Sequence, residues 1–134
     1  MRILVASSSA HRQAFYRGAI EGLGDEVRVA VSGVECAESL RKERPDLLIL
    51  ETPLLWGGSD GVLAVLEESA GGQSLPVILV AASSSAEDWF QLGRFRVDNF
   101  LFHVPTAGEL HRAIAGCAVG PPQTSRAEPI AQPG

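Results

Sequence analysis

Four polar residues follow short apolar runs in this sequence. Glu51 ends the run at residues 47–50, Ser7 and Ser8 follow the first run, and His103 follows the last. A carboxylate in such a place can act as a nucleophile or as a ligand of a cation. A hydroxyl, an imidazole and an acid together can form a hydrolytic triad. The chemistry that is available therefore depends on whether the ends of these runs meet.

Two alternatives follow from the serines. A serine hydrolase would use Ser7 or Ser8 with His103 and Glu51, but the sequence has no GxSxG elbow and no clear oxyanion donor set after the serines. A small anion-binding or nucleotide-binding module would instead hold its ligand at the amino end of the helix after Ser7 to Ala10, although no wider phosphate-binding pattern supports it. The ordinary role of these serines is to cap that helix.

The apolar runs predict a parallel sheet. Residues 47–50 are consecutively apolar and cannot alternate between two faces, which is typical of a strand covered on both sides. Helical spacing follows each run, so strands and helices alternate strictly. This pattern predicts a doubly wound α/β domain with a five-stranded parallel sheet, helices on both faces and the flavodoxin-like order 2-1-3-4-5. The predicted strands are residues 2–6, 27–31, 47–50, 76–81 and 99–102.

Helix boundaries and faces are predicted from caps and periodicity. The first helix should span residues 10–23 with Phe15, Ala19 and Leu23 on its buried face. The second should bury Val34, Ala37 and Leu40. The third should start with Asp60 as its cap. Capping boxes are predicted at Ser85 with Asp88 and at Thr106 with Glu109.

Over about residues 2–117 these runs resemble the receiver domain of response regulators. That family has an acidic pair after the first strand, a phosphoaccepting Asp at the end of the third, a Ser or Thr at the end of the fourth and a Lys after the fifth. The matching positions here are Ser7 and Ser8, Glu51, Ala81 and His103. The order of the apolar runs is that of the family, but each position that carries the family's chemistry holds a different residue. The resemblance therefore implies an atypical, pseudo-receiver-like domain.

These departures predict that conventional phosphorylation is lost. Mg²⁺ prefers carboxylate ligands, and Ser7 and Ser8 supply neutral hydroxyls, so magnesium should bind poorly and we expect no cofactor. Glu51 could imitate a phosphorylated Asp, but a carboxylate brings one charge where a phosphoryl group brings about −1.5 to −2. We expect a single locked state in which Ser7, Ser8 or His103 holds Glu51. A carboxylate that is simply solvated at the sheet edge is the plainer alternative.

The resemblance also implies a partner surface. The family contacts proteins through the fourth helix, fifth strand and fifth helix. Here Trp89 is expected in the fourth helix and Phe95 and Arg96 directly after it, and Phe100 matches the family's switch aromatic. The implied function is a phosphorylation-independent interaction module in bacterial signal transduction, such as a two-component phosphorelay, and not an enzyme. Its partner would be a protein, with a homodimer as a further option.

Composition sets the remaining expectations. The chain has 134 residues, a formal net charge of −5 and 46% hydrophobic residues, which fits one domain and gives no reason to expect direct binding to nucleic acid. No run approaches a membrane span, so a cytoplasmic protein without membrane contact is expected. The domain should cover residues 1–118, and residues 119–134, with four prolines, should form a flexible tail.

Overall fold

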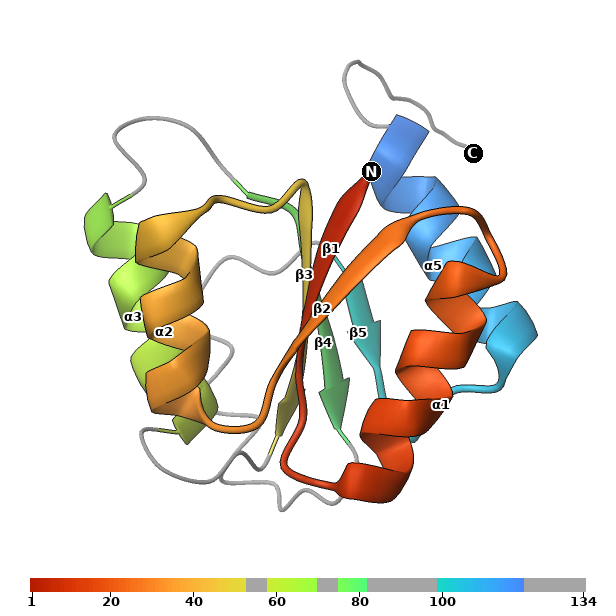
Figure 1. Cartoon of the computed structure of the whole chain (residues 1–134), viewed down its shortest axis with the longest axis horizontal. Coiled ribbons are helices and arrows are strands. Elements are labelled where there is room, and N and C mark those ends of the chain that lie inside the picture. The colour runs from red at the N-terminus through yellow and green to blue at the C-terminus, as the bar shows by residue number, and fades with distance from the viewer. Residues whose placement is uncertain (53–57, 70–74, 82–98, 120–134) are drawn as a thin grey trace, which may run out of the picture.

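The computed structural model describes residues 1–52, 58–69, 75–81 and 99–119. Strands and helices alternate from β1 to β4 (Figure 1), while residues 82–98, between β4 and β5, lie outside the described residues. The strands are β1 (Arg2–Ala6), β2 (Glu26–Ala30), β3 (Leu47–Thr52), β4 (Val77–Ala81) and β5 (Asn99–Leu101). The helices are α1 (Ala10–Glu21), α2 (Gly33–Lys42), α3 (Gly58–Ser69) and α5 (Ala107–Val119).

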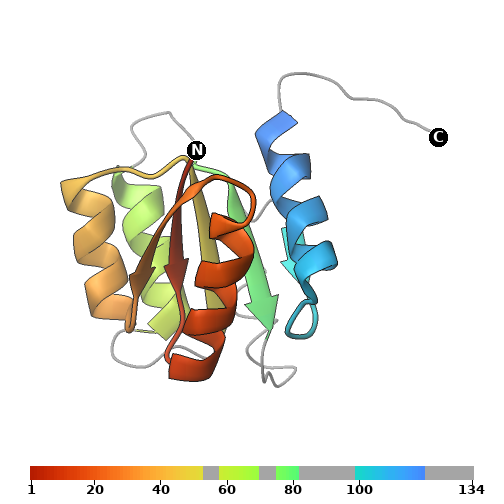
Figure 2. The ribbon, with the colours of Figure 1, turned by 45° about the vertical axis from the view of Figure 1, so that its right-hand side comes forward.

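All neighbouring strands pair in parallel, in the order β2-β1-β3-β4-β5. Helices α2 and α3 cover one face of the sheet, and α1 and α5 cover the other, as the two views in Figures 1 and 2 show. The predicted doubly wound sheet and its strand order are therefore confirmed. Because the strands are parallel, the residues that follow β1, β3 and β4 all lie at one edge of the sheet.

The core consists of two apolar clusters, one on each face of the sheet. Alternate residues of β3 point to opposite faces, so Leu48 and Leu50 join the cluster under α2 and α3, while Leu47 and Ile49 join the cluster under α1 and α5. All six residues of β3 are buried. The prediction that this run is a strand covered on both sides is correct, and β3 is the middle strand of the sheet.

Side-chain caps fix where the helices begin. Ser9 is the N-cap of α1 and its hydroxyl accepts a hydrogen bond from the Arg12 amide, as expected for the serines after the first strand. The capping box before α5 is also confirmed, since the Glu109 amide donates to the Thr106 hydroxyl at 3.2 Å and the Thr106 amide donates to the Glu109 carboxylate at 2.9 Å. The second predicted box, at Ser85 and Asp88, lies outside the described residues.

The predicted buried faces of the first two helices were partly wrong. In α1 the fully buried residues are Tyr16 and Ile20, while Leu23 lies beyond the helix and is 42% exposed. The predicted Phe15 and Ala19 are only partly buried beside them. In α2 the prediction of Ala37 holds and Leu40 is partly buried, but Val34 is exposed and Cys36 is buried in its place.

Several predicted boundaries also shift. β2 ends at Ala30, which leaves Val31 outside the strand and exposed, and β3 extends through Glu51 to Thr52. α3 begins at Gly58, before the predicted cap Asp60, and Gly58 has φ 69°, a value that favours glycine. β5 is shorter than predicted and ends at Leu101. The boundary between domain and tail near residue 118 remains a prediction, and residues 120–134 lie outside the described residues.

Within the described ranges, no helix combines the length and the apolar character that crossing a membrane requires.

Candidate functional site

Glu51 lies inside the molecule, at the carboxyl end of β3. Its exposed fraction is 0%, and it pairs in register with Val80 of β4. Strand alternation places its side chain on the same face as Leu47 and Ile49, which is the face covered by α1 and α5. The alternative of a carboxylate solvated at the sheet edge is therefore wrong.

Within the described part of the chain, the side chains of three residues donate hydrogen bonds to this buried carboxylate. The Ser7 hydroxyl donates to Oε1 at 2.6 Å. The Tyr16 hydroxyl at 2.7 Å and Nε of Arg12 at 2.8 Å both donate to Oε2. Arg12 also supplies the positive charge of an ion pair. Both carboxylate oxygens thus have partners, as a buried charge requires.

The chain between β1 and α1 positions these donors. β1 ends at Ala6, and the Ser7 amide donates to the Ala30 carbonyl at 3.0 Å, which holds Ser7 beside the end of β2. The Gln13 side-chain amide donates to the Ser7 carbonyl at 2.6 Å. Arg12 and Tyr16 are four residues apart on α1, so they lie one turn apart on the same side of the helix. This side of α1 faces Glu51.

Burial and the nearby Glu51 carboxylate both change the pKa of the Tyr16 phenol. Burial raises the pKa of its phenol strongly, and the negative charge of Glu51 and the hydrogen bond to it raise it further, while Arg12 opposes the shift. The hydroxyl therefore remains protonated and available as a donor well beyond neutral pH. Tyr16 is fully buried, so this donor cannot turn toward solvent.

The predicted site residues do not all gather at Glu51. Ser7 does, which agrees with the expectation that it holds the carboxylate. The hydroxyl of Ser8 donates to the Val31 carbonyl at 3.2 Å. The side chain of His103 is 66% exposed, and its Nε2 lies 3.2 and 3.3 Å from the two carboxylate oxygens of Glu109.

Ala81 and Phe100, two further predicted site residues, have apolar side chains that cannot hydrogen-bond to Glu51. Ala81 ends β4, is 6% exposed and pairs in register with Thr52. Phe100 is half-buried in β5, packs against the cluster under α2 and α3, and stacks on Phe102 with ring centroids 6.1 Å apart. The predicted partner residues Trp89, Phe95 and Arg96 lie outside the described residues.

Arg12 and Tyr16 were not singled out from the sequence. The available signal is their spacing: a cationic and a phenolic donor stand four residues apart on the helix that directly follows the first strand. A carboxylate at the end of a buried strand needs such donors. His111 of α5 is half-buried, and its Nε2 lies 3.1 Å from the Ala19 carbonyl.

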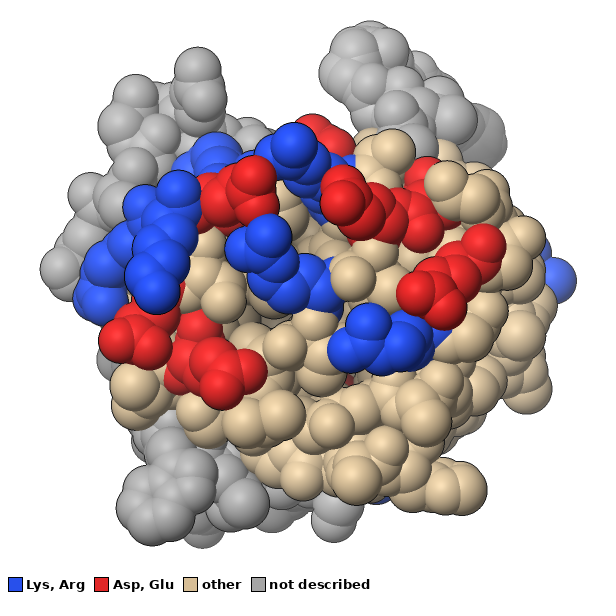
Figure 3. Space-filling view, viewed as in Figure 1, with Lys and Arg blue, Asp and Glu red and all other residues tan. Residues whose placement is uncertain are grey.

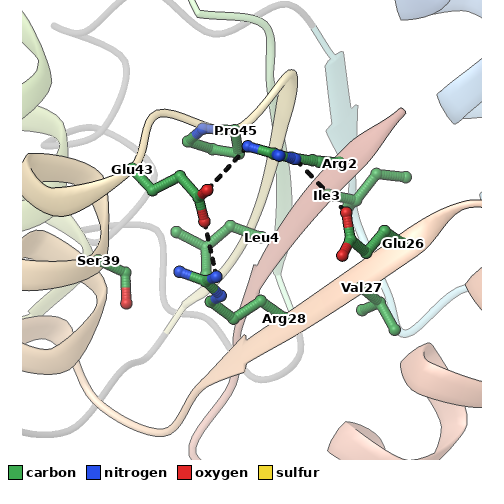
Figure 4. Close-up of a pocket in the computed structure, with 9 residues that line it drawn as sticks. All are labelled: Arg2, Ile3, Leu4, Glu26, Val27, Arg28, Ser39, Glu43 and Pro45. Carbon is green, nitrogen blue, oxygen red and sulfur yellow. Dashed lines mark hydrogen bonds and ion pairs between the residues drawn. The ribbon is translucent and has the colours of Figure 1, made fainter.

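A pocket of about 150 Å³ lies at the opposite edge of the sheet, at the amino ends of β1 and β2 (Figure 4). Its charges already pair with one another: Glu43 bridges Arg2 at 2.8 Å and Arg28 at 2.6 Å, and Arg2 also contacts Glu26 at 3.4 Å. Figure 3 shows such alternating charges in the upper part of the molecule and few charged side chains in the lower part. The pocket is thus separate from Glu51.

Among the described residues, no cluster of three or more His, Cys, Asp or Glu side chains is placed to hold a metal ion. The same is true at Glu51, where the identified partners of the carboxylate are a guanidinium and two hydroxyls.

Comparison with known proteins gives structural matches only. No family model matches the sequence, and no curated protein matches it. Among solved structures, the chain is similar to the receiver domain of a sensor histidine kinase from Pseudomonas aeruginosa, solved with a magnesium ion in its active-site cleft. The TM-score is 0.81 at 17% identity, covering 89% of this chain and 98% of that one.

Two further solved structures show the same relationship. The receiver domain of a signal transduction histidine kinase from Syntrophus aciditrophicus matches with a TM-score of 0.81 and 20% identity, covering 95% of this chain and 96% of that one. The receiver domain of a modulated diguanylate cyclase from Desulfovibrio desulfuricans matches with a TM-score of 0.76 and 25% identity, covering 87% and 91%. The chain has the fold of these domains.

Proposed function

We propose that this chain, which has the fold of the response-regulator receiver domains, is a phosphorylation-independent receiver-like domain that works by binding another protein. The observation that carries the proposal is the state of Glu51. This residue stands where the resemblance places the phosphoacceptor, and its carboxylate is 0% exposed and held by Arg12, Tyr16 and Ser7. A nucleophile must reach its substrate, and this one faces the interior.

The residues around Glu51 do not fit a magnesium ion. The receiver domain from Pseudomonas aeruginosa was solved with Mg²⁺ in its cleft. Mg²⁺ requires oxygen ligands in near-octahedral geometry, usually with carboxylates among them. Among the described residues, the Glu51 carboxylate already forms an ion pair with the Arg12 guanidinium at 2.8 Å, which neutralises the charge that would attract a second cation. The positions of the acidic pair are Ser7 and Ser8.

Two alternative functions gain no support from the geometry. A hydrolase needs a serine with a histidine beside it, but Ser7 donates to Glu51, and His103 is largely exposed beside Glu109. An anion-binding module needs free donors at the start of α1. The Ser9 amide donates instead to the Ser7 hydroxyl, and the Arg12 amide donates to the Ser9 hydroxyl.

An exposed aromatic residue supports the interaction role. Phe102 follows β5, is 59% exposed and stacks on Phe100, and the nearby Val104 is 37% exposed. These apolar groups lie between β5 and α5, within the region through which receiver domains contact partners. Aromatic side chains of this kind supply much of the binding energy at protein interfaces. We therefore propose a protein partner, or a second copy of the chain, for this surface.

The test is whether the wild-type domain responds to the ligands of a phosphorylation site. Addition of Mg²⁺, and then of beryllofluoride, should leave the amide NMR spectrum unchanged, and acetyl phosphate should add no phosphoryl mass. The Pseudomonas aeruginosa receiver domain is the matched control for magnesium binding, since it was solved with the ion bound. Saturable shifts around Glu51, or a phosphorylated product, would overturn the proposal.

A further inference from the structure

The first turn of α1 carries a basic side chain where helix electrostatics favours an acidic one. The amino end of a helix carries partial positive charge, which favours acidic side chains there and disfavours basic ones. α1 has no acidic residue in its first turn, and Arg12 occupies its third position. Residues that are locally unfavourable in this way occur in folded proteins where they have another role.

The side chain of Arg12 extends to the buried carboxylate of Glu51. Its side chain is 31% exposed, whereas the Glu51 side chain that it contacts at 2.8 Å is 0% exposed. Arg12 therefore extends from the molecular surface to the buried carboxylate. Tyr16 and Ser7 also donate to that carboxylate, but both are neutral, so Arg12 is the positive charge in this set of donors.

We infer that Arg12 is a tethered cation that determines which ions can reach Glu51: it occupies the place next to the carboxylate and thereby excludes diffusible cations. Removal of the guanidinium should leave a buried carboxylate with an unfilled space beside it. That space matches one chemical class of ligand, a small planar cation of the guanidinium type. The inference rests on the proposed function only in taking Glu51 as permanently held.

The experiment is chemical rescue of Arg12→Ala, followed by thermal melting. Breaking a buried ion pair is strongly destabilising, so the melting temperature should fall by roughly 5 to 15 °C. Guanidinium chloride at low millimolar concentration, far below denaturing levels, should raise it again by a few degrees through binding to the folded state. Urea, the neutral analogue of similar shape, and NaCl at equal ionic strength should not.

Two variants serve as matched controls. Arg17→Ala removes an exposed arginine from the same helix and should change the melting temperature little. The double variant Arg12→Ala/Glu51→Gln removes the charge that attracts the ligand, so guanidinium should no longer stabilise it. Equal stabilisation of the single and double variants would overturn the inference, as would an Arg12→Ala variant that melts together with Arg17→Ala.

If Arg12→Ala does not fold, Arg12→Lys and Arg12→Met replace it. Both keep a long stem and differ in charge, so Arg12→Lys should melt well above Arg12→Met. Equal melting temperatures would show that Arg12 acts by packing and would reject the inference. None of these measurements involves a phosphodonor or a partner protein. Their failure is therefore distinct from failure of the proposed function, which is tested on the wild-type chain.

Discussion

Tyr16 connects the interior of the sheet to helix α1 through a single hydroxyl. That hydroxyl donates to Glu51 at 2.7 Å, and the ring is fully buried and lies 5.4 Å from the ring of Phe15. Burial and the negative charge of Glu51 both raise the pKa of the phenol. A tyrosinate at this place would face a carboxylate without solvent to screen the repulsion.

The titration of Tyr16 can be measured directly because it is the one tyrosine in the sequence. We expect the near-ultraviolet absorbance of tyrosinate to stay absent well above pH 10 in the native protein, and to appear only as the protein unfolds. A pKa raised on folding stabilises the native state fully below the unfolded pKa of about 10, and that stability is lost as the pH rises above it.

The denatured chain is the internal control for this titration, since its tyrosine should ionise near pH 10. Glu51→Gln keeps the shape of the site and removes the negative charge, so Tyr16 should ionise at a lower pH than in the wild type. A native protein that ionises near pH 10 while its far-ultraviolet circular dichroism is unchanged would contradict the hydrogen-bonded, buried position of the phenol.

At the scale of one element, α5 depends on its capping box. Thr106 and Glu109 exchange two hydrogen bonds across the first turn, and the Thr106 amide and His103 lower the pKa of the Glu109 carboxyl. We expect Thr106→Ala to lower the free energy of unfolding by about 1 kcal/mol in urea titrations. Thr106→Ser keeps the hydroxyl and should remain close to the wild type.

The pH dependence of this cap has a definite sign. A carboxyl whose pKa is lowered on folding stabilises the native state above its unfolded pKa, and this contribution is lost as the pH falls through the folded value. The difference in stability between the wild type and Glu109→Gln should therefore shrink in acid. A difference that is constant from neutral to acidic pH would show that the charge of Glu109 does not contribute.

Elements with one consistent signal could be predicted from the sequence. The apolar runs of β3 and β4 admit a single interpretation, and the spacing of Thr106 and Glu109 is a local cap. The buried face of α1 could not be predicted, because Phe15 with Ala19 and Tyr16 with Ile20 form adjacent stripes with the same spacing. The contact with Glu51 decides between them, and that contact is 35 residues distant along the chain.

The candidate site shows the same division. Glu51 and Ser7 could be singled out because both directly follow apolar strands, and the parallel sheet brings such positions to one edge. His103 follows a strand as well, but β5 ends at Leu101, and the histidine turns toward Glu109 in the next capping box. Arg12 was missed because an arginine in a helix is usually a surface residue, and only the buried acid gives it a role.

At the scale of the whole molecule, the two edges of the sheet differ in character. Paired charges surround the amino ends of β1 and β2, where Glu43 bridges two arginines (Figures 3 and 4). At the carboxyl edge the charge of Glu51 is enclosed, and the exposed groups include the apolar Phe102, Val34 and Val31. Because Glu51 is enclosed and paired with Arg12, we assign the proposed interaction to the exposed apolar side chains of this edge.

Substitutions around Phe102 can test the proposed interaction surface. Phe95 and Arg96 lie outside the described residues, but the sequence places them between β4 and β5, close in the chain to the exposed Phe102. If these residues form a binding surface, Phe95→Ala, Arg96→Ala and Phe102→Ala should each weaken self-association or partner capture. Their melting temperatures should stay near that of the wild type. Sedimentation velocity and thermal melting of the same samples measure both quantities.

Ile114→Ala is the control for a structural side chain, because Ile114 is 4% exposed in the core under α1 and α5. It should lower the free energy of unfolding by about 2 to 5 kcal/mol. A binding residue and a core residue thus differ in which measurement they change. If Phe95→Ala costs the ~3 to 5 kcal/mol typical of a buried aromatic, its ring is part of the core, and the proposed surface must be sought around Phe102 alone.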